Sequence, residues 1–337
     1  MAAQAWAVDR LGRFGANPAI EAELARRAPT LLIDDGNPFL ARPTACSFAR
    51  DGGAPQTVTL AWRRIAQSRL EALAASVTHP ARAGMGVTPF AGGYWIALET
   101  LDPSAQKVVD AVTAQQTALR AAPMVVLDLR GNGGGNSDYA DRIAAALVGE
   151  ARAKAAWPEI HGCTGPFWRA TAGNLPAVES AAARSKAQGD PNIAQYWSDL
   201  AADMAAAVKE GRGFAPALPP CVREARPASR GREPALPPSA MRGRLVLVTD
   251  RSCFSSCLLA TDLFRRLGAL HVGEATDVST RYMEVREIVL PSGLRTFSTL
   301  QKVVVGADDF GPYAPDRPYP GPLDDGDALK AWVAALR

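Results

Sequence analysis

The chain has 337 residues and a mass of 35.6 kDa, which is long enough for two or three modules. Hydrophobic residues make up 47% of it and charged residues 21%, so a sizeable core is expected and wholesale disorder is excluded. Its 37 Lys and Arg against 34 Asp and Glu do not suggest a nucleic-acid-binding protein. No run approaches the roughly 18 apolar residues of a membrane span.

The first 85 residues are expected to form an N-terminal module. In chain order, the patterns predict a helix, the two strands of a hairpin and a second helix, over residues 17–27, 45–49, 57–62 and 65–76. The hairpin rests on the alternation in TVTLAW and on the turn residues Asp51, Gly52 and Gly53. Residues 77–93 contain Gly and Pro and are typical of a linker.

Residues 86–150 follow a regular α/β pattern. Strands are predicted at 93–98 and 123–129, and the helices after them at 102–120 and 138–148. The second strand is almost continuously apolar, as in a sheet buried on both faces. Strand and helix alternating in this way predict a parallel sheet.

Residues 151–240 interrupt this pattern, and we predict a helical insertion or lid there. The apolar spacing over residues 192–209 predicts an amphipathic helix, and residues 211–241 are rich in Pro, Gly and Arg, as in an exposed loop. The α/β pattern resumes over residues 241–337. Its predicted elements are a strand, a helix, a strand, a hairpin and a closing helix, at 244–249, 258–267, 269–273, 281–299 and 325–336.

Two turns between a buried strand and a helix carry candidate chemistry. In the first, Gly131 and Gly133–Gly135 allow backbone N–H groups to converge on a phosphate or a developing oxyanion. It lacks the Lys-Ser/Thr ending of a phosphate-binding loop, which argues against nucleotide binding. A tight turn without a ligand is the alternative interpretation.

The second turn places Ser255 between a strand and a helix. A serine in such a turn is held away from the sheet, and the N–H of Ser256 then points to where an oxyanion would form. Serine is also a common helix cap, which is the alternative. Because sites in parallel sheets lie at the carboxyl ends of strands, the two turns together predict acyl-transfer chemistry.

The segments GYWIAL, VVLDLRGNGGG, LVLVTD, CFSSC and HVGEAT, in this order, resemble the core of the C-terminal processing (tail-specific) serine peptidases, in particular the branch of the tricorn core and the retinoid-binding protein repeats. The resemblance implies an α/β fold of the crotonase/ClpP type with a mostly parallel sheet, here with a partial PDZ-like N-terminal module. It also implies a Ser255 nucleophile and oxyanion donors at Ser256 and at Gly134 or its neighbours Gly133 and Gly135.

The general base of that family does not carry over. The segment after Gly273-Glu274-Ala275-Thr276 contains no lysine, and residues 1–78 contain no histidine. His79, in the predicted linker, is the leading candidate base. The alternatives are His161, His271, Lys302 or no base at all.

Three functions therefore remain open. The first is a serine peptidase that cleaves peptides or unfolded proteins through an acyl-enzyme on Ser255, without a cofactor, metal, nucleic acid or membrane span. The second is a peptide-binding protein that has kept the fold and lost the base. The third is a crotonase-like enzyme acting on a thioester, although no pattern suggests an adenine or pantetheine pocket.

Five cysteines are present, and either one or more disulfides or small buried thiols are expected. Cys253 and Cys257 could be bridged only where the backbone bends favourably, and Cys163 and Cys221 could join the ends of one segment. Neither Cys253 nor Cys257 has a neighbouring His or Lys in sequence to make it a nucleophile. The cysteine content suggests a periplasmic or secreted protein if residues are missing before Met1.

Overall fold

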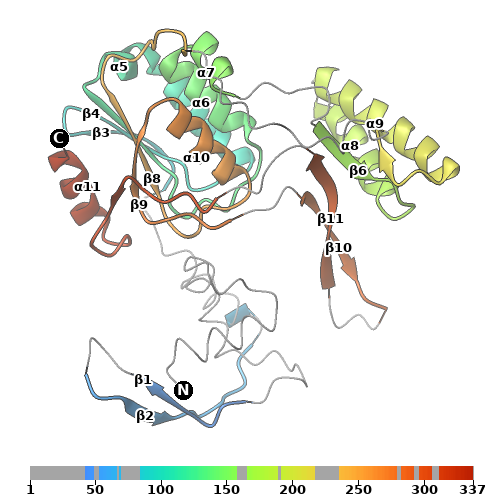
Figure 1. Cartoon of the computed structure of the whole chain (residues 1–337), viewed down its shortest axis with the longest axis horizontal. Coiled ribbons are helices and arrows are strands. Elements are labelled where there is room, and N and C mark those ends of the chain that lie inside the picture. The colour runs from blue at the N-terminus through green and yellow to red at the C-terminus, as the bar shows by residue number, and fades with distance from the viewer. Residues whose placement is uncertain are drawn as a thin grey trace. The chain divides into compact units, whose positions relative to one another are not determined.

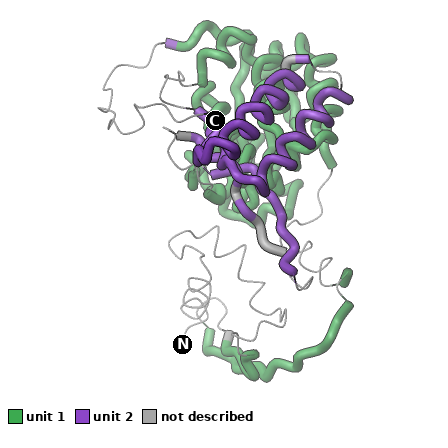
Figure 2. The backbone as a smooth tube through the Cα atoms, turned by 90° about the vertical axis from the view of Figure 1, so that its right-hand side faces the viewer, with its two compact units in different colours: residues 1–157, 236–278, 311–337 green, residues 158–235, 279–310 purple. Residues whose placement is uncertain are grey.

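The computed structural model describes residues 42–48, 53–66, 68–69, 84–157, 165–188, 191–216, 235–278, 282–291, 296–305 and 311–336. The chain divides into two compact units (Figure 2). Unit 1 comprises residues 1–157, 236–278 and 311–337, and unit 2 comprises residues 158–235 and 279–310. No helix among the described residues is long and apolar enough to cross a membrane.

Unit 1 is built on a six-stranded sheet with the order β12-β9-β8-β5-β4-β3 (Figure 1). The strands are β3 (Gly86–Phe90), β4 (Gly93–Ala97), β5 (Met124–Asp128), β8 (Arg244–Thr249), β9 (Leu270–Gly273) and β12 (Arg317–Pro318). All neighbouring pairs are parallel except β3 and β4. The predicted α/β fold with a mostly parallel sheet is confirmed.

The core of unit 1 lies around the central strands, because β5 and β8 are apolar on both faces. On one face, side chains of these strands pack with Leu329 and Val333 of α11 (Gly326–Ala335). Alternating residues such as Leu127 and Leu247 point to the other face, where helices cover the sheet. These helices are α4 (Gln106–Ala114), α5 (Gln116–Ala121), α6 (Asp138–Val148), α7 (Glu150–Ala156) and α10 (Ser256–Arg266).

Local capping explains where the first helical segment of the core begins. The Asp102 side chain accepts a hydrogen bond from the Ser104 N–H at 2.7 Å, and Pro103 opens the 3-10 turn η2 (Pro103–Ala105). The predicted start at Asp102 is therefore confirmed. The predicted single helix over 102–120 is instead divided into η2, α4 and α5.

The predicted linker over residues 77–93 is wrong in its second half, which forms β3. Val87 pairs with Ile96 and Phe90 with Gly93 in an antiparallel ladder. Pro89 is tolerated because β3 lies at the end of the strand order, where one row of backbone groups needs no partner. Ahead of it, β1 (Ala45–Phe48) and β2 (Gln56–Thr59) form the predicted hairpin. The predicted helices over residues 17–27 and 65–76 lie outside the described residues or nearly so, and the PDZ-like module remains a prediction.

In its described residues, unit 2 combines a small antiparallel sheet with two helices. The sheet has the order β10-β11-β6-β7, and its strands are β6 (Gly165–Arg169), β7 (Phe214–Ala215), β10 (Tyr282–Val289) and β11 (Thr296–Val305). The helices are α8 (Leu175–Gln188) and α9 (Pro191–Glu210), and the second matches the predicted amphipathic helix. Val178 of α8 and Met204 of α9 pack with Trp168 of β6 in a separate hydrophobic cluster.

This division differs from the predicted insertion over residues 151–240 in two ways. The helix α7 belongs to unit 1, and the hairpin of β10 and β11, expected in the α/β core, belongs to unit 2. The reason is non-local: β11 pairs antiparallel with β6, for example Val303 with Phe167. An exposed hairpin gains a third strand in this way, and no pattern within either segment indicates the pairing.

Candidate active site

The glycine-rich turn after β5 and the serine turn after β8 lie against each other in unit 1. A Cβ atom placed on Gly134 would lie 2.7 Å from the Cβ of Ser255, so only glycine permits this approach. The Phe254 N–H donates to the Asn132 carbonyl at 3.3 Å, and the Ser256 hydroxyl donates to the Gly135 carbonyl at 2.7 Å. The two turns that the sequence singled out are thus brought together.

Ser255 lies immediately before α10 with φ of 54° and ψ of −125°. An L-residue rarely adopts a positive φ, and strained backbone of this kind is concentrated at functional sites. Its side chain makes no capping hydrogen bond to α10. The alternative interpretation of Ser255 as an ordinary capping serine therefore lacks the bond that defines a cap.

The Ser256 N–H has no acceptor within α10, because Ser256 is the first residue of that helix. The Gly134 N–H, in contrast, donates to the Asn132 side chain at 2.9 Å. Among the described residues, the N–H groups of Gly133 and Gly135 have no acceptor. Of the three glycines expected as donors, Gly134 therefore shapes the turn, and its neighbours have available N–H groups.

Asn132 is a site residue that the sequence reasoning missed. It is fully buried, and its side chain donates to the Leu98 carbonyl at 2.8 Å while accepting from Gly134. Its carbonyl also receives the Phe254 N–H. One side chain and one carbonyl thus connect β4, the glycine turn and the serine turn. A lone asparagine among glycines suggests a turn, and nothing in sequence indicates these distant partners.

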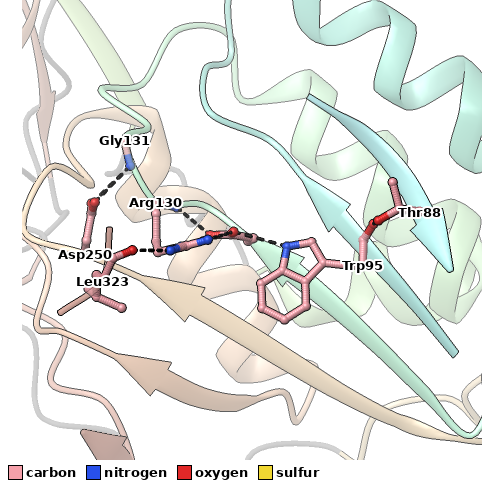
Figure 3. Close-up of polar contacts among 7 residues, drawn as sticks. Thr88, Trp95, Arg130, Gly131, Asp250 and Leu323 are labelled. Atoms are coloured by element: carbon pink, nitrogen blue, oxygen red, sulfur yellow. Dashed lines mark hydrogen bonds and ion pairs between the residues drawn. The ribbon is translucent and has the colours of Figure 1, made fainter. Parts of the chain in front are cut away.

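The first residues of the DLRG motif form a buried structural network (Figure 3). Arg130 donates to both carboxylate oxygens of Asp128, at 2.8 and 2.6 Å, and to the carbonyl of Leu323. Trp95 also donates to Asp128, at 3.1 Å. Burial lowers the pKa of Arg130, but the hydrogen bonds to Asp128 together with the negative charges of nearby carboxylates outweigh this effect, and the pKa lies above its usual value. The motif therefore fixes the end of β5 and presents no reactive group.

Asp250, which follows β8, also connects the two turns through hydrogen bonds. Its carboxylate accepts the Gly131 N–H at 3.2 and 3.1 Å and the Ser252 N–H at 2.9 Å. Figure 3 shows Asp250 and Gly131 facing each other across the ends of β5 and β8. The geometry of both turns is thus fixed by hydrogen bonds between them.

The candidate bases have different placements. His79, the leading candidate, and His161 lie outside the described residues. His271 is fully buried in β9, its Nε2 lies 2.7 Å from the Thr249 hydroxyl, and burial lowers its pKa to about 4. Lys302 lies in unit 2, where it donates to Glu284 at 2.8 Å. No described residue donates to or accepts from the Ser255 hydroxyl.

Cys253 and Cys257 form a disulfide across the serine turn. This excludes both as thiolate nucleophiles, in agreement with the sequence argument. Cys163 and Cys221 lie outside the described residues, and Cys46 is a free thiol.

Neither a scan of family models nor a search of curated proteins finds a match to the chain. Solved structures do match. Mature CPAF is 13% identical, with a TM-score of 0.52, and mature CPAF complexed with lactacystin is 14% identical, with a TM-score of 0.50. Each match covers 97% of this chain and 74% of that chain. The photosystem II D1 C-terminal processing protease is 16% identical over 75% of this chain and 50% of its own, with a TM-score of 0.35.

The chain therefore has the fold of mature CPAF, and the predicted family resemblance is confirmed at the level of the fold. Identities of 13–14% do not extend this result to activity.

Proposed function

We propose that this chain is a serine peptidase whose nucleophile is Ser255 and whose substrate is a peptide or an unfolded protein. The observation that carries the proposal is the positive φ of Ser255 at the start of α10, directly against the glycine turn. This combination holds a hydroxyl beside available backbone N–H groups, which acyl transfer requires.

In the proposed reaction, the Ser255 oxygen attacks the carbonyl carbon of the substrate and its proton passes to a general base. The N–H of Ser256 and that of Gly133 or Gly135 donate to the resulting oxyanion. The carbon–nitrogen bond then breaks, and the amine leaves with the proton that the base returns. Water hydrolyses the acyl-enzyme by the same steps and restores the serine.

We assign the base to a histidine outside the described residues, with His79 first and His161 second. The support is that the two other candidate bases already have partners away from Ser255: the buried His271 bonds Thr249, and Lys302 bonds Glu284. A serine without a base is a poor nucleophile. The second candidate function, a peptide-binding protein with the same fold, is favoured by the observation that no described residue bonds the Ser255 hydroxyl.

A fluorophosphonate probe tests the proposal, because an activated serine attacks its phosphorus and forms a covalent adduct, whereas an ordinary serine does not. We expect the adduct mass at Ser255, no labelling of Ser255→Ala, and unchanged labelling of Ser252→Ala, the matched control in the same turn. His79→Ala should slow labelling by about 10²-fold or more if His79 is the base. Folded protein that is unlabelled at every pH would contradict the peptidase and leave the peptide-binding function.

A further inference from the structure

The Cys253–Cys257 disulfide encloses the centre of the candidate site. Between its two ends lie only Phe254, Ser255 and Ser256, so the proposed nucleophile is the middle residue of the bridged segment. Both cysteines are fully buried, and their Cα atoms are 5.3 Å apart. The bridge therefore limits the conformations of this one turn.

This turn needs an external constraint. A positive φ at a residue other than glycine costs roughly a tenfold or larger population penalty and persists only where the surroundings impose it. Ser255 does not cap α10 with its own side chain. Within the turn, Cys257 donates to Phe254 at 3.1 Å and Leu258 donates to Ser255 at 2.9 Å, and both are backbone bonds of a helix start.

The bridge ties α10 to a point that is fixed elsewhere. The Cys253 N–H donates to the Asp250 carbonyl at 3.0 Å, and the Cys253 carbonyl accepts the Asp277 N–H at 3.1 Å. Cys253 is thus held between the end of β8 and the segment that follows β9. Cys257 lies in the first turn of α10, so the covalent link fixes that turn relative to both segments.

We propose that Cys253 and Cys257 are positioning residues, whose disulfide holds Ser255 and the Ser256 N–H in the geometry for attack. The inference rests on the proposed function for its effect on reactivity, whereas its effect on the turn is independent of it. A disulfide that closes so short a loop constrains the unfolded chain less than a long loop would, which favours a local role over a general stabilising one.

The test compares wild type with the double variant Cys253→Ala/Cys257→Ala, and Cys46→Ala controls for loss of a cysteine that is not bridged. The rate of fluorophosphonate labelling at Ser255 is measured well below the unfolding temperature of each protein. We expect a fall of about 10- to 100-fold in the double variant, because small misplacements of a reacting group have effects of this size. Cys46→Ala should keep the wild-type rate.

Hydrogen exchange followed by mass spectrometry reports on the turn without depending on catalysis. In the double variant, the protection factors of peptides covering residues 254–260 should fall at least tenfold. Those of peptides from α6 (Asp138–Val148) should not change. This pattern separates a local effect on the turn from general destabilisation, which would move both sets of peptides.

Reduced wild type provides a form in which sulfur still fills the buried space. A dithiol reductant transfers two hydrogens to the two cysteine sulfurs and closes its own disulfide, and alkylation with peptide mapping identifies both thiols. Reduced protein should behave as the double variant does, and it replaces that variant if the variant fails to fold.

Unchanged labelling and unchanged exchange of the turn after loss of the bridge would overturn the inference. If wild type is not labelled at Ser255, the proposed function fails, and the exchange measurement alone then decides whether the bridge holds the turn. If α6 lost as much protection against hydrogen exchange as the turn does, the inference would also be overturned, because the disulfide would then act only on global stability.

Discussion

At the scale of single residues, the site is defined by groups that hold backbone in place. Asn132 and Asp250 connect the two turns through hydrogen bonds, and Gly134 permits a contact that a Cβ atom would prevent. Asp128 and Arg130 form a buried pair below them. Breaking one partner of such a pair leaves an uncompensated buried charge, so these residues stabilise the site without taking part in chemistry.

The buried His271 gives a prediction for the pH dependence of stability. Burial and, to a lesser extent, Arg265 lower its pKa from 6.5 to about 4, while Asp316 acts in the opposite direction. Above pH 6.5 the imidazole is neutral in both the folded and the unfolded state. As pH falls from 6.5 towards 4, only the unfolded state takes up the proton. The free energy of unfolding should therefore fall by about 3 kcal/mol at most.

Urea denaturation of wild type and His271→Gln between pH 7 and pH 4 measures this contribution. Carboxylates also titrate in this range, so the informative quantity is the difference between the two proteins. The difference in free energy of unfolding should narrow as pH falls. Parallel pH curves for the two proteins would contradict the assignment of this pH dependence to His271.

At the scale of elements, sequence patterns located most of the unit 1 strands and helices, with the largest errors at boundaries and edges. The helix predicted to begin at Leu258 begins at Ser256, because the left-handed backbone of Ser255 allows an abrupt start. The strand β3 was predicted as a linker, because a proline in a short segment is more often part of a loop.

The cap of α11 gives a prediction at this scale. The Asp325 side chain accepts the Ala328 N–H at 3.0 Å, and Leu329 and Val333 of the same helix pack on the sheet. Asp325→Ala should lower the free energy of unfolding by about 1 kcal/mol. Denaturant unfolding measures this change in the free energy of unfolding. Asp325→Asn should keep most of the wild-type stability.

Asp327→Ala is the matched control, because Asp327 lies in the first turn of α11 and is exposed but does not cap the helix. It should change stability by only a few tenths of a kcal/mol. Equal losses in the two alanine variants would show that the charge near the helix start, and not the cap, stabilises α11.

At the scale of the whole molecule, two units are interleaved along one chain (Figure 2). Unit 2 consists of two separate segments joined by the pairing of β6 with β11. Each unit has its own hydrophobic cluster. We therefore expect unit 1 to fold without unit 2, provided that both segments are removed together.

Replacing residues 158–235 and 279–310 by flexible Gly/Ser linkers should leave a monomeric protein with a cooperative thermal transition. Removing residues 158–235 alone would leave β11 without its neighbour β6, and an unpaired strand edge promotes association. Size-exclusion chromatography and circular dichroism distinguish these outcomes. Loss of cooperative unfolding after removal of both segments would show that unit 2 is integral to the fold of unit 1.

The amino-acid pattern alone predicts the α/β class, the central strands β5 and β8, and the two turns that carry the candidate site. It could do so because burial on both faces gives a continuous apolar run, and a turn at the end of such a run has a fixed place in a parallel sheet. The places of Ser255 and of the glycines in these two turns follow from the sequence for this reason.

Which groups meet at that place depends on contacts between distant parts of the chain. Three contacts could not be predicted from local sequence patterns. They are the hydrogen bond from Gly134 to Asn132, the hydrogen bond from Arg130 to Leu323, and the pairing of β6 with β11. The same holds for the left-handed backbone of Ser255, which the surrounding turns impose on a residue that would not adopt it alone. Hydrophobic periodicity in the sequence indicates which face of a helix or strand is buried. Which elements pack against that face depends on tertiary packing, and this packing fixes the geometry of the site.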